Sequence, residues 1–74
     1  MPAQIVMDRK GDSRYFFDAA HTESLAAAEA RYKELTAKGY RSVAPGKDGQ
    51  PGRLLCRFDK DAEETLFIPP LVGG

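Results

Sequence analysis

The chain has few of the residues on which small extracellular domains often depend for stability. It has one cysteine and one histidine in 74 residues. A single cysteine excludes an internal disulfide, which small secreted domains commonly need. No apolar run approaches the roughly 20 residues that span a bilayer, and no signal-peptide pattern opens the chain. We therefore expect a reduced, cytoplasmic protein with no membrane partner.

A net charge is also lacking, because 11 basic and 11 acidic residues cancel and the pI is about 6.6. Nucleic-acid-binding domains usually carry a net positive charge that displaces counterions. Arg14, Arg53 and Arg57 lie among aromatic residues, as in a sheet that stacks bases, but sheet cores use aromatic residues anyway. We expect no nucleic-acid partner. Near-zero net charge leaves association with a protein partner or a second copy unopposed.

The length allows one domain with a modest core. A chain of this size buries roughly 60% of its unfolded surface and has marginal stability. Apolar residues make up 42% and charged residues 30% of the chain, which is ordinary globular composition. A core, a substrate pocket and a catalytic group do not fit together easily in this length, so we expect a protein that is not an enzyme.

The first part of the chain predicts a hairpin followed by a helix. Residues 3–8 and 13–18 are apolar or aromatic runs joined by a short polar segment with Gly11. Residues 21–39 favour a helix, with Thr22 or Ser24 as the cap and Gly39 as a Schellman stop. One helical stripe carries the apolar residues Leu25, Ala28, Tyr32 and Leu35, and the opposite face carries the pairs Glu29–Lys33 and Glu34–Lys38.

The rest of the chain alternates strands and polar turns. Residues 40–44, 53–58 and 65–68 read as strands, with an exposed loop rich in proline and glycine at 45–52. The helix stripe needs a sheet face to cover. We therefore expect a single globular α+β domain over residues 1–68, β-grasp-like, with one long helix on a mixed sheet of four or five strands. Residues 69–74 are expected to form a flexible tail.

The tail, "IPPLVGG", has an unusual composition. Pro69 and Pro70 hold the chain extended and away from the sheet edge. Gly73 and Gly74 lack a Cβ, so their backbone can lie close against the walls of a narrow channel. Such a tail suits an enzyme that activates a C-terminal carboxylate with ATP.

The ending "LFIPPLVGG" resembles that of the MoaD/ThiS-type sulfur carriers, which close with an aromatic residue, two prolines, two further residues and two glycines. The acidic turn and short strand before it are also similar, so the resemblance covers residues 59–74. It implies a ubiquitin-like carrier whose Gly74 carboxylate is adenylated by an E1-like enzyme. The adenylate is then converted to a thiocarboxylate for sulfur transfer or joined to an amine.

This reading assigns covalent activation to Gly73 and Gly74. It makes Phe67 the anchor of the strand from which the tail leaves, and the partner-binding residues of the tail are Pro69, Pro70, Leu71 and Val72. We expect no bound cofactor and no metal, since the ATP is used by the partner. The partner is an E1-like adenylating enzyme or an acceptor protein, and the chain is monomeric alone or in a hetero-complex. The alternative is a β-grasp-like interaction or structural module without covalent tail chemistry.

Three other patterns carry little chemistry. Cys56 with His21 as a base would make a nucleophile, but Cys56 shares the predicted strand face of Leu54 and Phe58, so we expect a buried core thiol. His21 is expected to be a surface residue at the helix entry. The acidic segment 59–64 departs from a calcium loop, because Glu64 stands where glycine is required, and we expect a solvated turn.

Overall fold

The computed structural model describes residues 1–70 and consists of one helix and a five-stranded mixed sheet. The strands are β1 (Ala3–Asp8), β2 (Gly11–Phe16), β3 (Arg41–Ala44), β4 (Arg53–Leu54) and β5 (Glu64–Ile68). Helix α1 covers Thr22–Ala37. The predicted α+β class and the single helix are confirmed, and the mixed sheet, predicted to have four or five strands, has five.

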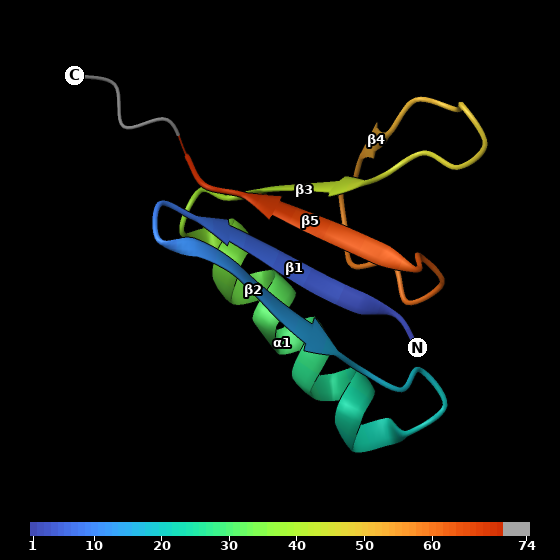
Figure 1. The fold of residues 1–74 in the computed structure, drawn as a ribbon. Helices are drawn as coiled ribbons and strands as arrows, with labels where there is room; N and C mark the ends of the chain where they lie inside the picture. The colour runs from blue at the N-terminus through green and yellow to red at the C-terminus, as the bar shows by residue number, and fades with distance from the viewer. Residues whose placement is uncertain (71–74) are drawn as a thin grey trace.

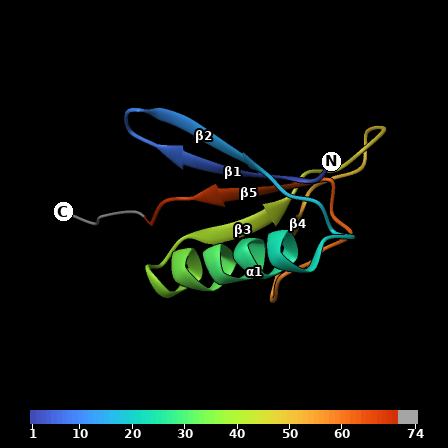
Figure 2. The same cartoon turned by 90° about the horizontal axis from the view of Figure 1, so that it is seen from below.

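The sheet has the strand order β2-β1-β5-β3-β4. β1 pairs with β5 in parallel, and the other neighbours are antiparallel. The helix lies across one face of the sheet and leaves the other face open (Figures 1 and 2). The last strand in sequence, β5, therefore lies in the middle of the sheet, between β1 and β3.

The β1–β2 hairpin turns through Arg9 and Lys10, and Asp8 pairs with Gly11. Gly11 has a φ of 125°, a conformation that residues with a side chain rarely adopt. The second strand therefore starts at this glycine, two residues before the start that the sequence predicts. It also ends earlier, at Phe16, and Phe17 turns into the core, where it is 3% exposed.

Helix α1 ends as the sequence predicts. Gly39 has a φ of 94°, its N–H donates to the Thr36 carbonyl, and the Tyr40 N–H donates to the Leu35 carbonyl at 3.1 Å. This pair of bonds is the Schellman motif. The cap at the start differs from the prediction, because the Ser24 N–H donates to Nδ1 of His21 at 3.4 Å.

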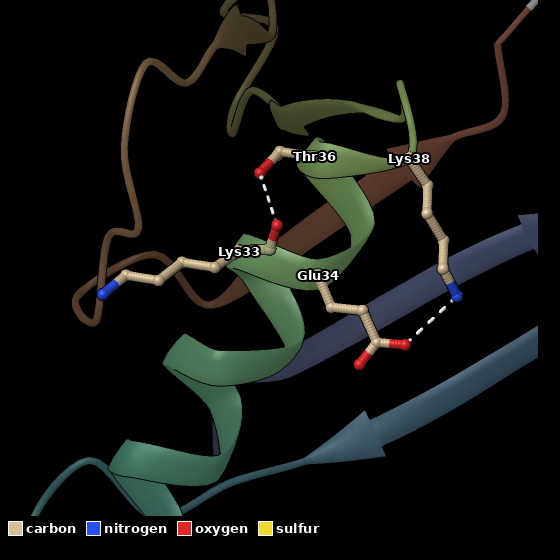
Figure 3. A network of polar contacts seen from close by, with 4 residues as sticks. All are labelled: Lys33, Glu34, Thr36 and Lys38. Atoms are coloured by element: carbon tan, nitrogen blue, oxygen red, sulfur yellow. Dashed lines mark hydrogen bonds and ion pairs between the residues drawn. The ribbon is translucent and has the colours of Figure 1, made fainter.

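The predicted apolar stripe of the helix faces the sheet. Ala28 and Tyr32 are buried, and Leu25 and Leu35 are half-buried. Of the two predicted ion pairs, Glu34–Lys38 is present at 3.1 Å and is drawn in Figure 3. The Glu29–Lys33 pair does not form among the described side chains, and Lys33 points away from Glu34 (Figure 3). The backbone carbonyl of Lys33 accepts a hydrogen bond from the Thr36 hydroxyl.

The core joins the helix to β5 and to the loop after β4. The Tyr32 ring packs against Phe67 with the ring centroids 5.8 Å apart and against Phe58 at 6.0 Å, and Phe58 also contacts Phe17. The Tyr32 hydroxyl accepts a bond from the Ser42 hydroxyl at 3.1 Å. This aromatic cluster fixes the helix over the central strand.

A buried glutamine adds a polar link between the helix and β1. The Gln4 side chain is fully buried, donates to the Ala28 carbonyl at 2.9 Å and accepts a bond from Arg31. The Arg31 guanidinium also lies over the Tyr15 ring, 4.2 Å from its centroid. Both the nitrogen and the oxygen of the Gln4 amide therefore have hydrogen-bond partners, and the buried side chain leaves no polar atom unsatisfied.

The predicted strand over residues 53–58 is wrong beyond Leu54. The chain leaves β4 after two residues, and Phe58 turns back into the aromatic cluster instead of extending the sheet. Leu54, Cys56 and Phe58 therefore do not share a strand face. Cys56 is exposed, so the prediction of a buried core thiol is also wrong.

Candidate functional site

The candidate site is the end of the sheet where β5 finishes. Phe67 is fully buried under the helix, whereas the next residue, Ile68, is 40% exposed on the open face. The parallel register with β1 brings Val6 beside Phe67, so the β1–β2 turn lies at the same end of the sheet as the end of β5 (Figure 1). The turn from α1 to β3 also lies there (Figure 2).

Pro69 and Pro70 follow β5 directly. Proline has no N–H to donate to a neighbouring strand, so pairing stops where the predicted tail begins. Pro70 lies beside the helix stop: a Cβ added at Gly39 would lie 3.4 Å from the Pro70 Cβ. The root of the tail thus lies between a buried strand and the end of the helix. Leu71, Val72, Gly73 and Gly74, to which the sequence assigns the tail chemistry, lie outside the described residues.

We expect replacement of Gly39 with alanine to destabilise the domain by about 1–2 kcal/mol, because a non-glycine residue with positive φ is strained by about this amount. The Pro70 contact at 3.4 Å leaves room for the methyl group, so the cost comes from the backbone. Urea unfolding monitored by circular dichroism measures it. Gly39→Asn is the matched control, since asparagine tolerates positive φ better. An alanine variant as stable as the asparagine variant would contradict this account.

The open face of the sheet carries an apolar surface. Gln4, Phe67 and Ser42 contact the helix, so their neighbours along each strand point to the opposite face. The strand register aligns these neighbours in rows; Ile5 is buried among them, and we call the following set the open-face patch: Met7, Phe16, Val43, Leu54, Leu66 and Ile68. Phe16 is 61% and Leu54 66% exposed. This surface adjoins the tail root through Ile68.

Basic side chains surround the tail root. Arg9 and Lys10 form the β1–β2 turn, Lys38 caps the helix, and Arg41 pairs with Ile68 across the β3–β5 ladder. All four are exposed, and among the side chains of residues 1–70 Lys38 is the one of them paired with a carboxylate, that of Glu34. Asp8, Asp12 and Glu34 lie at the same end of the described fold, so the four basic residues exceed the nearby acidic ones by one charge. This end can therefore form ion pairs with a partner surface that carries both signs.

The opposite end of β5 is bounded by the 45–52 loop and the acidic turn. An open depression of about 670 Å³ lies between them, and the Lys47–Glu63 ion pair at 3.0 Å borders it. The turn is a solvated one, as predicted: Asp59 pairs with Arg53 at 2.9 Å and accepts a bond from the Asp61 N–H. No group of three or more metal-ligating side chains occurs within residues 1–70.

The ion pair with Arg53 lowers the pKa of Asp59 below its ordinary value of 3.8, and the Asp61 N–H adds to this. The folded-state pKa is depressed, so the stabilisation is present above about pH 4 and is lost as the pH falls through the folded-state pKa. We expect Asp59→Asn to cost less than about 1 kcal/mol at neutral pH, as for exposed pairs, and less at about pH 3 than at neutral pH. Denaturation at both pH values measures this. Asp61→Asn, outside the ion pair, should show no comparable difference.

Cys56 and His21 do not form a catalytic pair. The Nδ1 atom of His21 accepts the helix-cap bond from Ser24, and no hydrogen bond joins this side chain to Cys56 in the described part of the chain. The histidine is exposed at the helix entry, as the sequence predicts. Two features of the site could not be predicted from the sequence: the position of Pro70 beside Gly39 and the exposure of Leu54. Gly39 and Pro70 are 31 positions apart, and no local sequence pattern indicates that they lie close together.

The helix of the described region is too short and too polar to cross a membrane. Scans against models of known protein families and searches of characterised proteins and solved structures find no match to this chain.

Proposed function

We propose that this chain is a ubiquitin-like carrier of β-grasp type whose Gly74 carboxylate is activated by an ATP-dependent, E1-like partner enzyme. The product is a thiocarboxylate for sulfur transfer or a conjugate with an amine. The observation that carries the proposal is that the Pro-Pro-x-x-Gly-Gly segment follows the buried central strand β5 directly. The hairpin, the crossing helix and the returning strands support the β-grasp assignment.

The surroundings of the tail root support a division of roles. The buried Phe67 holds the strand in place, and Pro69 and Pro70 direct the chain away from the sheet. In the proposed complex, Leu71 and Val72 fill the partner's channel, and Gly73 and Gly74 reach the ATP phosphate. The open-face patch and the basic side chains at the tail root form the docking surface for the partner.

The test is the intact mass and C-terminal peptide sequence of the protein isolated from its native host. It is repeated under sulfur starvation and in a strain without the adenylating enzyme. A sulfur-for-oxygen replacement at Gly74, or Gly74 joined to a lysine, is the expected result and distinguishes the two branches. An unmodified Gly74 carboxylate under every condition, or a chain that continues beyond Gly74 in the cell, would overturn the proposal.

A second candidate function is an interaction module that binds another protein without covalent chemistry. The exposed apolar side chains of Phe16 and Leu54 favour it, because such a patch on an uncovered sheet suits a protein interface. The two functions differ in how they respond to substitution. If the chain is an interaction module, Leu54→Asp should abolish partner binding and substitutions at Gly74 should leave it unchanged. If the chain is a carrier, substitutions at Gly74 should abolish its activation.

A further inference from the structure

The two edges of the sheet differ in their capacity to pair with another strand. β4 forms one edge with only two residues, Arg53–Leu54, after which the chain turns into the core. β2 forms the other edge with six residues, Gly11–Phe16, all of them exposed. In Figure 1, β2 is the outer strand of the hairpin, with no further strand beside it, and α1 passes behind it. A long exposed edge presents unpaired N–H and C=O groups to an incoming strand.

The alternation of hydrogen bonds between β1 and β2 shows which backbone N–H and C=O groups of β2 point away from β1. The Phe17 N–H donates to the Pro2 carbonyl at 3.0 Å, and the register pairs Phe16 with Ala3. Because bonded and non-bonded pairs alternate in an antiparallel ladder, Tyr15 and Ser13 also direct their backbone groups toward β1. The backbone groups of three residues therefore point away from the sheet, namely those of Asp12, Arg14 and Phe16.

The β2 sequence is complementary to itself in an antiparallel arrangement. If two copies of β2 pair about a two-fold axis at Ser13, Asp12 of each copy lies opposite Arg14 of the other. These are the residues whose backbone groups are free, so each such pair can exchange two backbone hydrogen bonds. Their side chains lie on the same face of the sheet and form two oppositely charged cross-strand pairs.

We propose that two copies of this chain associate through their β2 strands, with Ser13 on the two-fold axis, to form one continuous ten-stranded sheet. Both helices then lie on the same face, and the two tail roots lie at opposite ends. The Arg14–Glu64 ion pair at 3.3 Å leaves Arg14 half-exposed, so its guanidinium can bind a second carboxylate. Because the net charge of the chain is zero, no net electrostatic repulsion opposes the approach of two copies.

This association goes beyond the proposed carrier function and does not depend on it. It also differs from the monomer expected from the sequence. The contact is small, because it uses one strand edge from each copy, so we expect the dimer to be in fast exchange with the monomer at high micromolar to millimolar concentration.

Sedimentation equilibrium of the full chain and two charge variants tests the pairing register. Asp12→Arg and Arg14→Asp each place like charges opposite one another twice, and each variant alone should dimerise at least about tenfold more weakly than the wild type. In a one-to-one mixture the opposite charges are restored, and a mixed dimer should form with affinity close to that of the wild type. Because the mixture requires both variants to be folded, it controls for misfolding.

Amide hydrogen exchange of the wild-type protein gives an independent readout. Raising the concentration should slow exchange at the outward N–H groups of Asp12 and Arg14, which pair across the two-fold axis, and leave Ser13 and Tyr15, already bonded to β1, unchanged. A wild-type chain that stays monomeric at millimolar concentration would overturn the proposal. So would a dimer whose protection does not alternate along β2, or a mixture of variants that associates no better than either one alone.

Discussion

If the carrier proposal holds, adding one alanine after Gly74 should reduce ATP-dependent activation of the chain by its partner enzyme by at least about 100-fold. The extra residue moves the carboxylate by about 3.5 Å, and a displacement of about 1 Å at a reacting centre can already cost 100-fold. Gly74→Val should have a similar effect, because a Cβ prevents close approach of the backbone to the channel walls. The measurement is ATP–pyrophosphate exchange with the adenylating enzyme of the native host.

A matched control separates the position of the carboxylate from the length of the chain. One alanine inserted between Asp48 and Gly49, in the exposed loop at the far end of β5, lengthens the chain equally. Exposed loops tolerate such insertions with little change in stability. The loop variant should be activated at the wild-type rate. If the two insertions have equal effects, the carboxylate is not the reacting group, and the interaction module becomes the better account of the chain.

The helix and its ends could be predicted in detail because the signals are local. Gly39 is needed for a positive φ, and the spacing of Ala28 and Tyr32 defines one face of the helix whatever lies beneath it. The cap at His21 could not be predicted in this way. Thr22 and Ser24 are the usual capping residues, and the imidazole takes this role because the chain reaches the helix through the turn at Asp18, whose N–H donates to Ser24.

The errors occur where distant residues decide the structure. Alternating apolar residues at 54, 56 and 58 fit a strand. The Phe58 ring instead packs against Phe17 and Tyr32, and the chain leaves the sheet after Leu54 to reach them. Burial of Gln4 likewise depends on two helix groups that are more than twenty residues away, the Ala28 carbonyl and Arg31. For the candidate site, the tail residues are evident from the sequence, whereas the open-face patch becomes apparent only with the strand register.

Phe67→Ala is expected to have the largest effect on stability. The side chain is fully buried on the central strand and packs edge-on against Tyr32. Removing a buried phenylalanine costs about 3–5 kcal/mol, and a domain of this size is stable by only about 4–11 kcal/mol in total. The variant should therefore lose from about a quarter to all of its free energy of unfolding, as measured by urea denaturation and near-ultraviolet circular dichroism.

The neighbouring residue provides the matched control. Ile68 is on the same strand, one step nearer the tail, but its side chain points to the open face and is 40% exposed. Ile68→Ala should cost about 1 kcal/mol or less, since much of the side chain is already in contact with water. If the carrier proposal holds, the Ile68 variant should be stable yet bind the partner more weakly, because it removes part of the docking surface and leaves the strand in place. Equal destabilisation by the two substitutions would mean that β5 is not held by its helix-facing side, and the tail root would then lack the rigid support on which precise presentation of Gly74 depends.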